Sequence, residues 1–170
     1  MEQQLINDPA MPLSTSILTR LEHQHKTVHE LIRGFSETQL KQRVNPDKWS
    51  VFEQIAHLTS YQPVFLHRLQ QMEQQHEPAF DRYAADNDPA FNACLQRPLK
   101  ELEDDLTTQR FILHNHINRL PETALRRTGV HLRYGTMSIV QWTEFFLLHE
   151  SHHLFSIFQL TADMRKLFQQ

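Results

Sequence analysis

Two histidines near the end of the chain stand at the spacing of a helical metal site. The sequence holds 12 histidines in 170 residues, and His149 and His153 are four positions apart. Residues four apart on an α-helix lie one turn apart on the same face. Two imidazoles in that arrangement can bind one metal ion, at about 2.0–2.1 Å if the ion is zinc. His149 and His153 are therefore the first candidate ligands.

The apolar stripe of the helix indicates which way the side chains of His149 and His153 point. At about 100° per residue the pair lines up with that stripe, whereas His152 lies at its edge. The apolar residues in line with the pair are Trp142, Phe146 and Leu160. A buried imidazole without a partner costs about 1–3 kcal/mol. Sharing a metal ion would satisfy both rings, and hydrogen bonds to water or backbone at the core edge are the alternative.

The same letters fit the HExxH pattern of zinc proteases, in which Glu150 would be a general base between His149 and His153. That interpretation is disfavoured for two reasons. Glu150 is rotated about 100° from His149 on a helix. Such proteases also use a substrate-binding strand, and the sequence predicts no strand.

His57 is the third candidate ligand. It lies off the centre of the apolar face of its helix, on a polar strip that also carries Glu53 and Tyr61. Such a strip either faces solvent or lines an internal cavity beside the last helix. Glu53, one turn before His57, could orient the imidazole from behind. It could instead cap the helix with Ser50 in a capping box.

Hydrophobic periodicity predicts four helices that position these side chains. Few glycines, three in all, argue against an all-β chain. The stretch Glu77 to Ala90 is longer than a tight hairpin needs and could cross the bundle. We therefore predict an all-α four-helix bundle with one crossover. The expected helices are about Ser14 to Arg33, Trp49 to His76, Pro98 to Leu120, and Thr136, as N-cap after Gly135, to Lys166.

Composition narrows the class of protein. Hydrophobic residues make up 39% and charged residues 22%, with a net charge of −3, which is typical of one globular domain. Residues 13–170 are expected to form it, after a flexible arm of residues 1–12. No basic block supports nucleic-acid binding. No stretch reaches the about 20 apolar residues needed to span a membrane.

The single cysteine and the N-terminus bear on location. Cys94 alone can form neither an internal disulfide nor a CxxC zinc site, and we interpret it as structural. The first residues lack the basic start and apolar stretch of a signal peptide. We predict a cytoplasmic protein.

The order of these motifs resembles the DinB-like (YfiT-type) family over about Ser14 to Ala162. The resemblance rests on the segment from Trp49-Ser50 to His57-Leu58, a long third helix with Arg110, the pair Gly135-Thr136, and a last helix with His149, Glu150 and His153. It implies an up-down-down-up bundle with a long crossover between helices two and three. It also implies a divalent metal held by His57, His149 and His153 in a pocket toward one end. Family members with known activities include transferases and isomerases that use low-molecular-weight thiols, and others are described as hydrolases.

These observations favour a metal-dependent enzyme acting on a small-molecule substrate. Three imidazoles with open positions suit catalysis, and the ion could be Zn, Ni, Fe or Mn. The nucleophile would be a low-molecular-weight thiol, in an S-transferase, or water, in a hydrolase. Glu53, Tyr61 and His152 are candidate outer acids, bases or orienting groups.

The alternative is a non-catalytic binding or dimerisation module with a vestigial metal site. Its homodimer interface would use aromatic residues of the last helix, such as Phe145, Phe155 and Phe158. An open cavity of a few hundred cubic ångströms beside the histidines would favour the enzyme.

Overall fold

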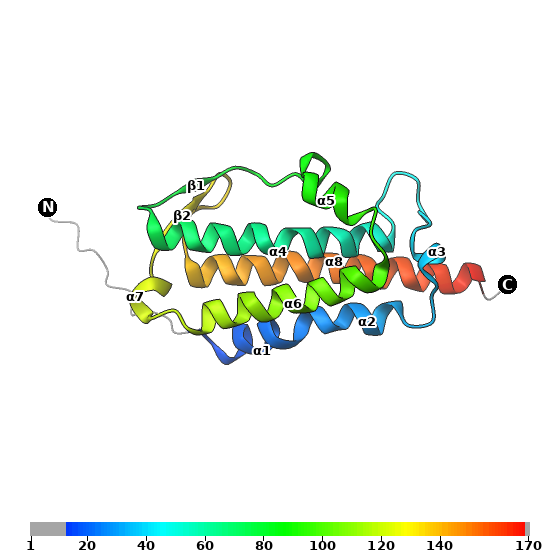
Figure 1. Cartoon of the computed structure of the whole chain (residues 1–170), viewed down its shortest axis with the longest axis horizontal. Helices are drawn as coiled ribbons and strands as arrows, with labels where there is room; N and C mark the ends of the chain where they lie inside the picture. Colours follow the sequence, from blue (N-terminus) through cyan, green and yellow to red (C-terminus); the bar gives the residue numbers. More distant parts are fainter. Residues whose placement is uncertain (1–12, 169–170) are drawn as a thin grey trace, which may run out of the picture.

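Four long helical segments lie side by side along the length of the molecule (Figure 1). The structure is a computed structural model that describes residues 13–168, so the predicted arm of residues 1–12 lies outside the described residues. The elements in chain order are α1 Thr15–His23, η1 Gln24–Lys26, α2 Thr27–Ile32, α3 Glu37–Leu40, α4 Val51–Gln74, β1 Ala79–Phe80, η2 Ala85–Asn87, α5 Pro89–Cys94, α6 Leu99–Asn118, α7 Glu122–Leu125, β2 Thr128–His131, β3 Gly135–Ser138 and α8 Ile139–Phe168.

The first predicted helix is present but carries a tight turn in its middle. It comprises α1, the 3-10 turn η1 and α2. Ser14 caps its start, because the Ser14 hydroxyl accepts a hydrogen bond from the Ile17 N–H at 3.2 Å. Gly34, with φ of +89°, follows its end. That left-handed conformation favours glycine and explains why the helix stops there.

The second predicted helix, α4, begins with the expected capping box. The Ser50 hydroxyl accepts a hydrogen bond from the Glu53 N–H at 3.2 Å, and the Glu53 carboxylate accepts one from the Ser50 N–H at 2.6 Å. This fixes the first turn of the helix that carries His57.

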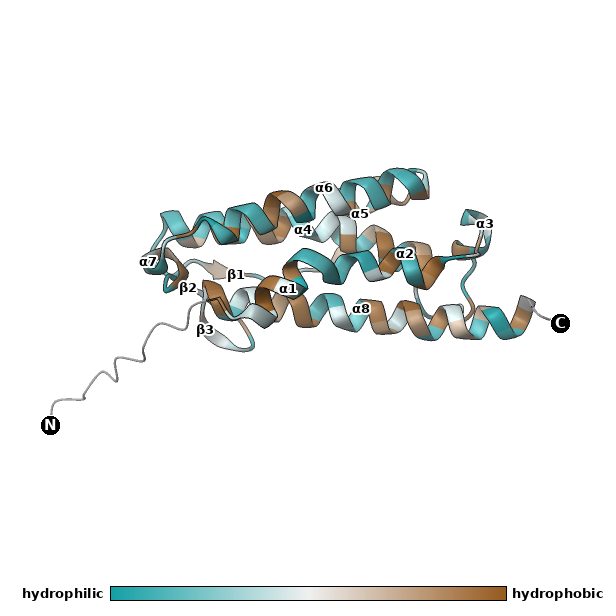
Figure 2. Ribbon diagram, turned by 90° about the horizontal axis from the view of Figure 1, so that it is seen from below, coloured by the Kyte–Doolittle hydropathy of each residue, from teal (hydrophilic) through white to brown (hydrophobic). Residues whose placement is uncertain are grey.

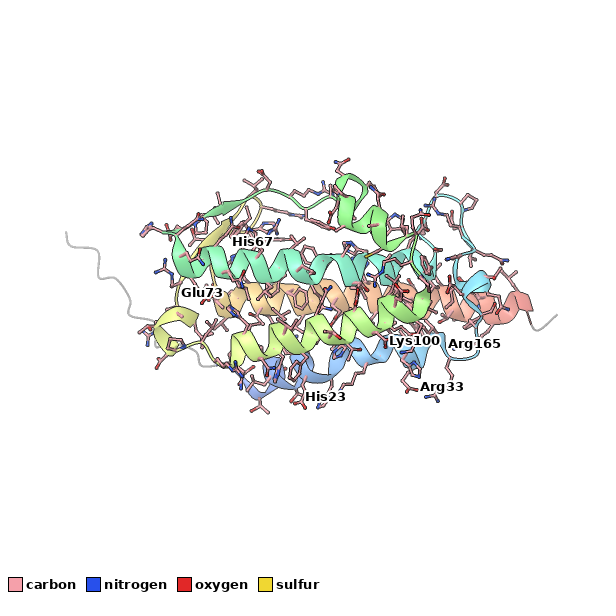
Figure 3. All side chains as sticks on the ribbon, in the orientation of Figure 1. His23, Arg33, His67, Glu73, Lys100 and Arg165 are labelled. Atoms are coloured by element: carbon pink, nitrogen blue, oxygen red, sulfur yellow. The ribbon has the colours of Figure 1, made fainter. Side chains whose placement is uncertain are left out.

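Helices α4 and α6 run in the same direction. Thr59 near the middle of α4 bonds the Leu102 carbonyl near the start of α6, at 3.3 Å. Glu73 at the far end of α4, labelled in Figure 3, bonds His116 near the end of α6, at 2.6 Å. Because both residue numbers rise together, the helices are parallel. The segment between them, residues 75–98, therefore crosses the length of the bundle.

Helix α8 runs antiparallel to α4 and parallel to the first helical segment. Gln54 of α4 bonds His153 of α8 at 2.6 Å, whereas Tyr61, later in α4, stacks on Phe146, earlier in α8, with ring centroids 6.2 Å apart. Earlier in α8, Glu144 pairs with Arg20 of α1 at 2.6 Å, and Arg165 near its end bonds the Leu31 carbonyl of α2 at 3.3 Å. The four long segments thus run up, down, down and up along the chain, as the colours of Figure 1 also show.

A small sheet at one end corrects the prediction that the chain contains no strand. Strand β2 pairs antiparallel with β3 and parallel with β1. Thr136 therefore lies in β3 and is not a helix cap, and α8 begins at Ile139. Gly135, with φ of +75°, permits the tight turn between β2 and β3. Gly129 in β2 packs so closely on Phe80 that an added Cβ would lie 2.8 Å from its ring.

Hydrophobic and hydrophilic residues alternate along the ribbons of the long helices (Figure 2), as expected for helices that bury one face. The buried apolar residues form two clusters, one toward each end of the bundle. Tyr61 and Phe65 belong to one cluster, and Phe52 and Phe91 belong to the other. His57, which is 3% exposed, lies on α4 one turn before Tyr61, near the boundary between the two clusters. The core therefore encloses a polar group in the middle of its length.

Candidate metal centre

Three imidazoles from two antiparallel helices converge on one point. His57 comes from α4, and His149 and His153 come from consecutive turns of α8. The His149 Nε2 lies 3.3 Å from the His57 Nε2 and 3.1 Å from the His153 Nε2. Within residues 13–168, these three are the one set of potential ligands whose donor atoms all lie within 4.8 Å of one another. The structure thus brings together all three histidines predicted from the sequence.

The spacing of the three nitrogens fits a single divalent ion. Bonds of about 2.0–2.1 Å with tetrahedral or octahedral angles require donor atoms roughly 2.8–3.4 Å apart. The His149 Nε2 meets that requirement with both of its neighbours, at 3.1 Å from His153 and 3.3 Å from His57. Three neutral imidazoles suit zinc, nickel or iron. They leave further coordination positions free, as catalytic sites do.

Burial keeps the three rings neutral. Desolvation is the main cause that lowers the pKa of His57 to about 3, of His149 to about 4 and of His153 to about 2. Neighbouring imidazoles lower each pKa further. A lone pair on each ring is therefore available at neutral pH, which is the form that binds a metal.

Gln54 fixes the tautomer of His153. The His153 Nδ1–H donates to the Gln54 Oε1 at 2.6 Å, so its Nε2 carries the lone pair that faces the other two rings. Sequence reasoning missed Gln54, which is 9% exposed. The sequence could have indicated Gln54, because it lies three residues before His57 and therefore on the same side of the helix.

Aromatic rings surround the imidazole of His57. Its ring centroid lies 5.2 Å from that of Trp49, 5.9 Å from Tyr61 and 5.7 Å from Tyr83. Phe91 of α5 stacks on Trp49 at 5.2 Å. The crossover segment thus supplies part of the wall, which limits the access of water to the imidazoles.

The three residues predicted to assist the metal ligands, Glu53, Tyr61 and His152, have different surroundings in the structure. Tyr61 borders the centre, with its ring 4.9 Å from that of His149. His152 is exposed, and it touches His153 only edge-on, at 5.4 Å. The Glu53 carboxylate is held by Ser50 and Arg43, so it caps α4 and does not orient His57.

Glu150 does not take the position of a zinc-protease base. Its carboxylate is 1% exposed and pairs with the equally buried Arg110 of α6. It also accepts a hydrogen bond from Gln24 at 2.8 Å, and Arg110 donates to Gln62 at 2.8 Å. Glu150 and Arg110 thereby link all four helical segments behind the histidines.

The three histidines open onto the side of a large cavity. Its volume is about 730 Å³, within the range of small-molecule sites. Residues 82–86 of the crossover and residues 131–134 of the β2–β3 turn line it, together with Tyr61 and Phe145. A substrate in this cavity would reach the triad from one side.

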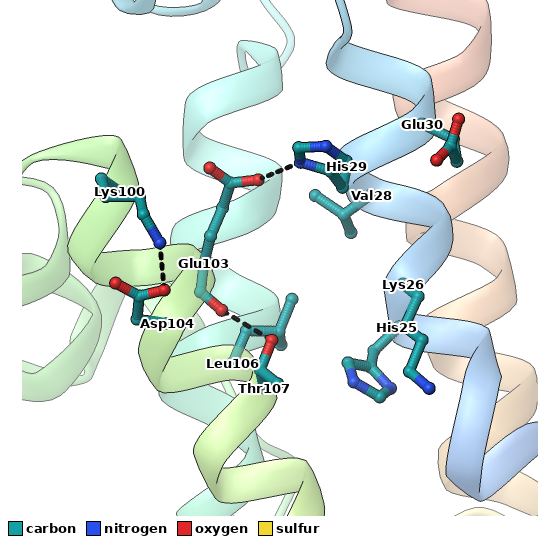
Figure 4. Close-up of a pocket in the computed structure, with 10 residues that line it drawn as sticks. All are labelled: His25, Lys26, Val28, His29, Glu30, Lys100, Glu103, Asp104, Leu106 and Thr107. Carbon is teal, nitrogen blue, oxygen red and sulfur yellow. Dashed lines mark hydrogen bonds and ion pairs between the residues drawn. The ribbon is translucent and has the colours of Figure 1, made fainter.

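A second cavity, of about 370 Å³, lies between the first helical segment and α6 (Figure 4). His29 there bonds Glu103 at 3.2 Å, and the buried His25 lies one turn away. Within the described part of the chain, this cavity gathers no three metal-binding groups at ligand distance. The first cavity is therefore the candidate active site.

Among the helices of the described chain, none has the length and apolar character required to cross a membrane. Cys94 is buried, and desolvation raises the pKa of its thiol. This fits the structural role predicted for it.

Comparisons with known proteins agree with this fold. The structure of YfiT from Bacillus subtilis matches with a TM-score of 0.75 and 15% sequence identity, over 92% of each chain. That protein is described as a probable metal-dependent hydrolase with an unusual four-helix bundle topology. No curated protein matches the sequence. The model of the DinB superfamily matches residues 20–157. The predicted resemblance is thus confirmed, and the chain belongs to the DinB superfamily.

Proposed function

We propose that the protein is a metal-dependent hydrolase of small molecules, with His57, His149 and His153 as the ligands of a divalent ion. The observation that carries this proposal is the convergence of three Nε2 atoms beside a cavity of about 730 Å³. An open cavity of this size is what an enzyme requires and a helix-packing module does not. The description of YfiT as a probable metal-dependent hydrolase supports the same class.

Each residue of the site has a definable task. Bound there, a divalent ion would supply Lewis acidity and lower the pKa of a water or thiol nucleophile. Gln54 holds the ring of His153 in the binding tautomer. Tyr61 keeps its proton, because burial raises the pKa of its hydroxyl. That hydroxyl can donate a hydrogen bond to negative charge that develops on a substrate.

A thiol-dependent S-transferase is the second candidate. The volume of the cavity favours it, because there is room for a small thiol beside an electrophilic substrate. The two candidates differ in whether turnover needs an added thiol.

The test is an activity screen with the metal-loaded protein. We expect turnover of activated esters such as 4-nitrophenyl acetate, with release of 4-nitrophenolate. Activity should be lost in His149→Ala and kept in His152→Ala, because His152 is the exposed neighbour on the same helix. If an alkyl halide is consumed only when 2-mercaptoethanol is present, the transferase replaces the hydrolase. If His149→Ala retains the wild-type rate with every substrate, the triad is not the catalytic centre.

A further inference from the structure

Three arginines line the part of the active-site cavity away from the histidines. They come from separate elements: Arg68 from α4, Arg82 from the crossover and Arg133 from the β2–β3 turn. Within residues 13–168, none of them forms a salt bridge with a carboxylate. Asp86 is the acidic residue of the lining. One region of the cavity therefore carries an excess of positive charge that the described protein does not neutralise.

Arg68 is held in place by uncharged groups. Its Nη2 donates to the Asp81 carbonyl at 2.8 Å, and its Nη1 donates to the Tyr61 hydroxyl at 3.5 Å. The guanidinium lies over the rings of Phe80 and Trp142, 5.4 and 5.9 Å from their centroids. These contacts orient the group but leave its charge without a counterion.

Tyr61 connects Arg68 with the metal centre. Its hydroxyl accepts the hydrogen bond from Arg68, and its ring lies 4.9 Å from that of His149. One aromatic side chain therefore lies between the guanidinium and the imidazole of His149. A small ligand can contact both across the cavity that all three residues line.

Arg133 adds charge to the same region. It lies on the exposed turn, with its guanidinium 5.4 Å from the ring centroid of Tyr134. After desolvation, Arg68 and Arg133 are the causes that lower the pKa of His131, which also lines the cavity. The fields of the two arginines therefore overlap at one position on the cavity wall.

We propose that the substrate is an anion, whose carboxylate or phosphate group is bound by Arg68 with help from Arg133 and Arg82 while its reacting group faces His57, His149 and His153. A guanidinium fork matches the geometry of carboxylate and phosphate oxygens. The aromatic side chains of Tyr61 and Phe145 would contact the apolar part of the substrate. This inference names the substrate class for the proposed function and rests on that function for the role of the histidines.

The test compares ligands that share a naphthalene ring and differ in charge, among which the carboxylate and the carboxamide also have the same shape. Binding of 2-naphthoate, 2-naphthyl phosphate and the neutral 2-naphthamide is measured by isothermal titration calorimetry, with the zinc-loaded full chain and again after removal of the metal. We expect at least one anion to bind about tenfold more tightly than the amide. The preference should persist without zinc and weaken as salt concentration rises. Tighter binding of naphthoate or of the phosphate identifies which anion the substrate carries.

Variants assign the preference to the arginines. The Arg68→Gln variant should lose most of the preference for anions over the amide. The double variant Arg82→Gln with Arg133→Gln should reduce this preference. These two exposed residues form no side-chain hydrogen bond in the described chain, so their replacement leaves the fold intact. Arg33→Gln is the matched control, because Arg33 lies at the opposite end and side of the bundle from β1 (Figure 3).

Three results would overturn the proposal: equal binding of anions and amide, an anion preference that exists only with zinc bound, or a preference that survives in the triple arginine variant. Because the measurement without zinc does not depend on the histidines, its outcome is separate from that of the proposed function. If the wild-type protein binds no metal but still prefers anions, the proposed metal centre is refuted and the anion site is not.

Discussion

Lone pairs on three buried imidazoles are the residue-scale basis of the proposed chemistry. Burial lowers the pKa of His57, His149 and His153 to between about 2 and about 4. Their rings are therefore neutral at pH 7 and need no proton release before they bind a cation. Gln54 adds direction, since it holds the proton of His153 on the nitrogen that faces away from the other rings.

Removal of the Gln54 carboxamide should weaken metal binding without preventing it. We expect Gln54→Leu to raise the dissociation constant for zinc by about 10–100-fold, because the orientation and tautomer of His153 are no longer fixed. Competition with a chromophoric chelator measures this constant. Gln70→Leu, at an exposed position of the same helix, is the control. Equal zinc affinities in the two variants would show that Gln54 has no such role.

His25 should make the fold sensitive to acid. Burial and then the charge of Arg110 lower the pKa of His25 from 6.5 to about 3. Below pH 6.5 the unfolded chain therefore binds a proton that the folded chain does not. The contribution of neutral His25 to the free energy of unfolding is complete above pH 6.5. It is lost as the pH falls toward 3, by about 1.4 kcal/mol per pH unit.

The measurement is the free energy of unfolding in urea, with a chelator present, at several pH values between 7 and 4. His25→Gln should show a shallower loss of stability on acidification than the wild type, because one proton-binding difference is removed. The three site histidines contribute equally to both proteins. Parallel curves would mean that His25 is accessible to protons in the folded state.

Residue spacing alone identified only part of the site. The one-turn separation of His149 and His153 was visible because both belong to one helix. His57 lies 92 positions before His149, so no local pattern joins them, and the resemblance to a family supplied that link. The contact between His153 and Gln54 also joins two helices, and it depends on a relative rotation that periodicity does not specify.

At the scale of elements, helix α8 presents functional side chains in two directions. His149 and His153 face the cavity, while Glu150, rotated by about 100°, faces Arg110 of α6. The same stretch of helix therefore carries two of the proposed metal ligands and one member of a buried ion pair. Helical periodicity predicted that Glu150 points away from His149, but it did not identify Arg110 as the partner of Glu150.

Loss of one member of this ion pair should be costly. We expect Arg110→Met to lower the free energy of unfolding by about 3–5 kcal/mol, because Glu150 would stay buried without its counterion. The double variant Arg110→Met with Glu150→Gln should recover part of this loss. Urea unfolding measures both. A single variant as stable as the wild type would show that water or rearrangement compensates the carboxylate.

Short strands were the elements that the sequence did not reveal. Strand β1 has two residues and β2 and β3 have four each, too few for an alternating pattern to emerge. Thr136 after Gly135 has the form of a helix cap, yet backbone pairing of β3 with β2 delays the helix to Ile139. The long helices were predicted well, because their apolar stripes extend over many turns.

At the scale of the whole molecule, the crossover segment covers the candidate metal centre. Because α4 and α6 are parallel, residues 75–98 must return along the full length of the bundle, over the side that bears β1 and α5 in Figure 1. Tyr83 and Phe91 of this segment reach His57 and Trp49. Because of this topology, the long connection forms one side of the cavity beside the three histidines.

The exterior of α8 carries exposed aromatic residues. Phe155 and Phe158 are 59% and 50% exposed, and their rings lie 6.3 Å apart. Phe145, the third aromatic residue of the expected dimer face, lines the cavity instead, and the homodimer itself stays a prediction. Sedimentation equilibrium of the wild type and of Phe158→Asp would test it, since a dimer through this face should dissociate in the variant.

The most direct test of the central claim is the metal content of the full chain, purified without an affinity tag or chelator. Elemental analysis should find about one divalent ion per chain in the wild type and in His152→Ala, and almost none in His57→Ala, His149→Ala and His153→Ala. All five proteins should have the same far-ultraviolet circular dichroism. Retention of a full equivalent of metal by the three ligand variants, or no metal in the wild type after dialysis against zinc, nickel and manganese, would contradict the assignment of the triad.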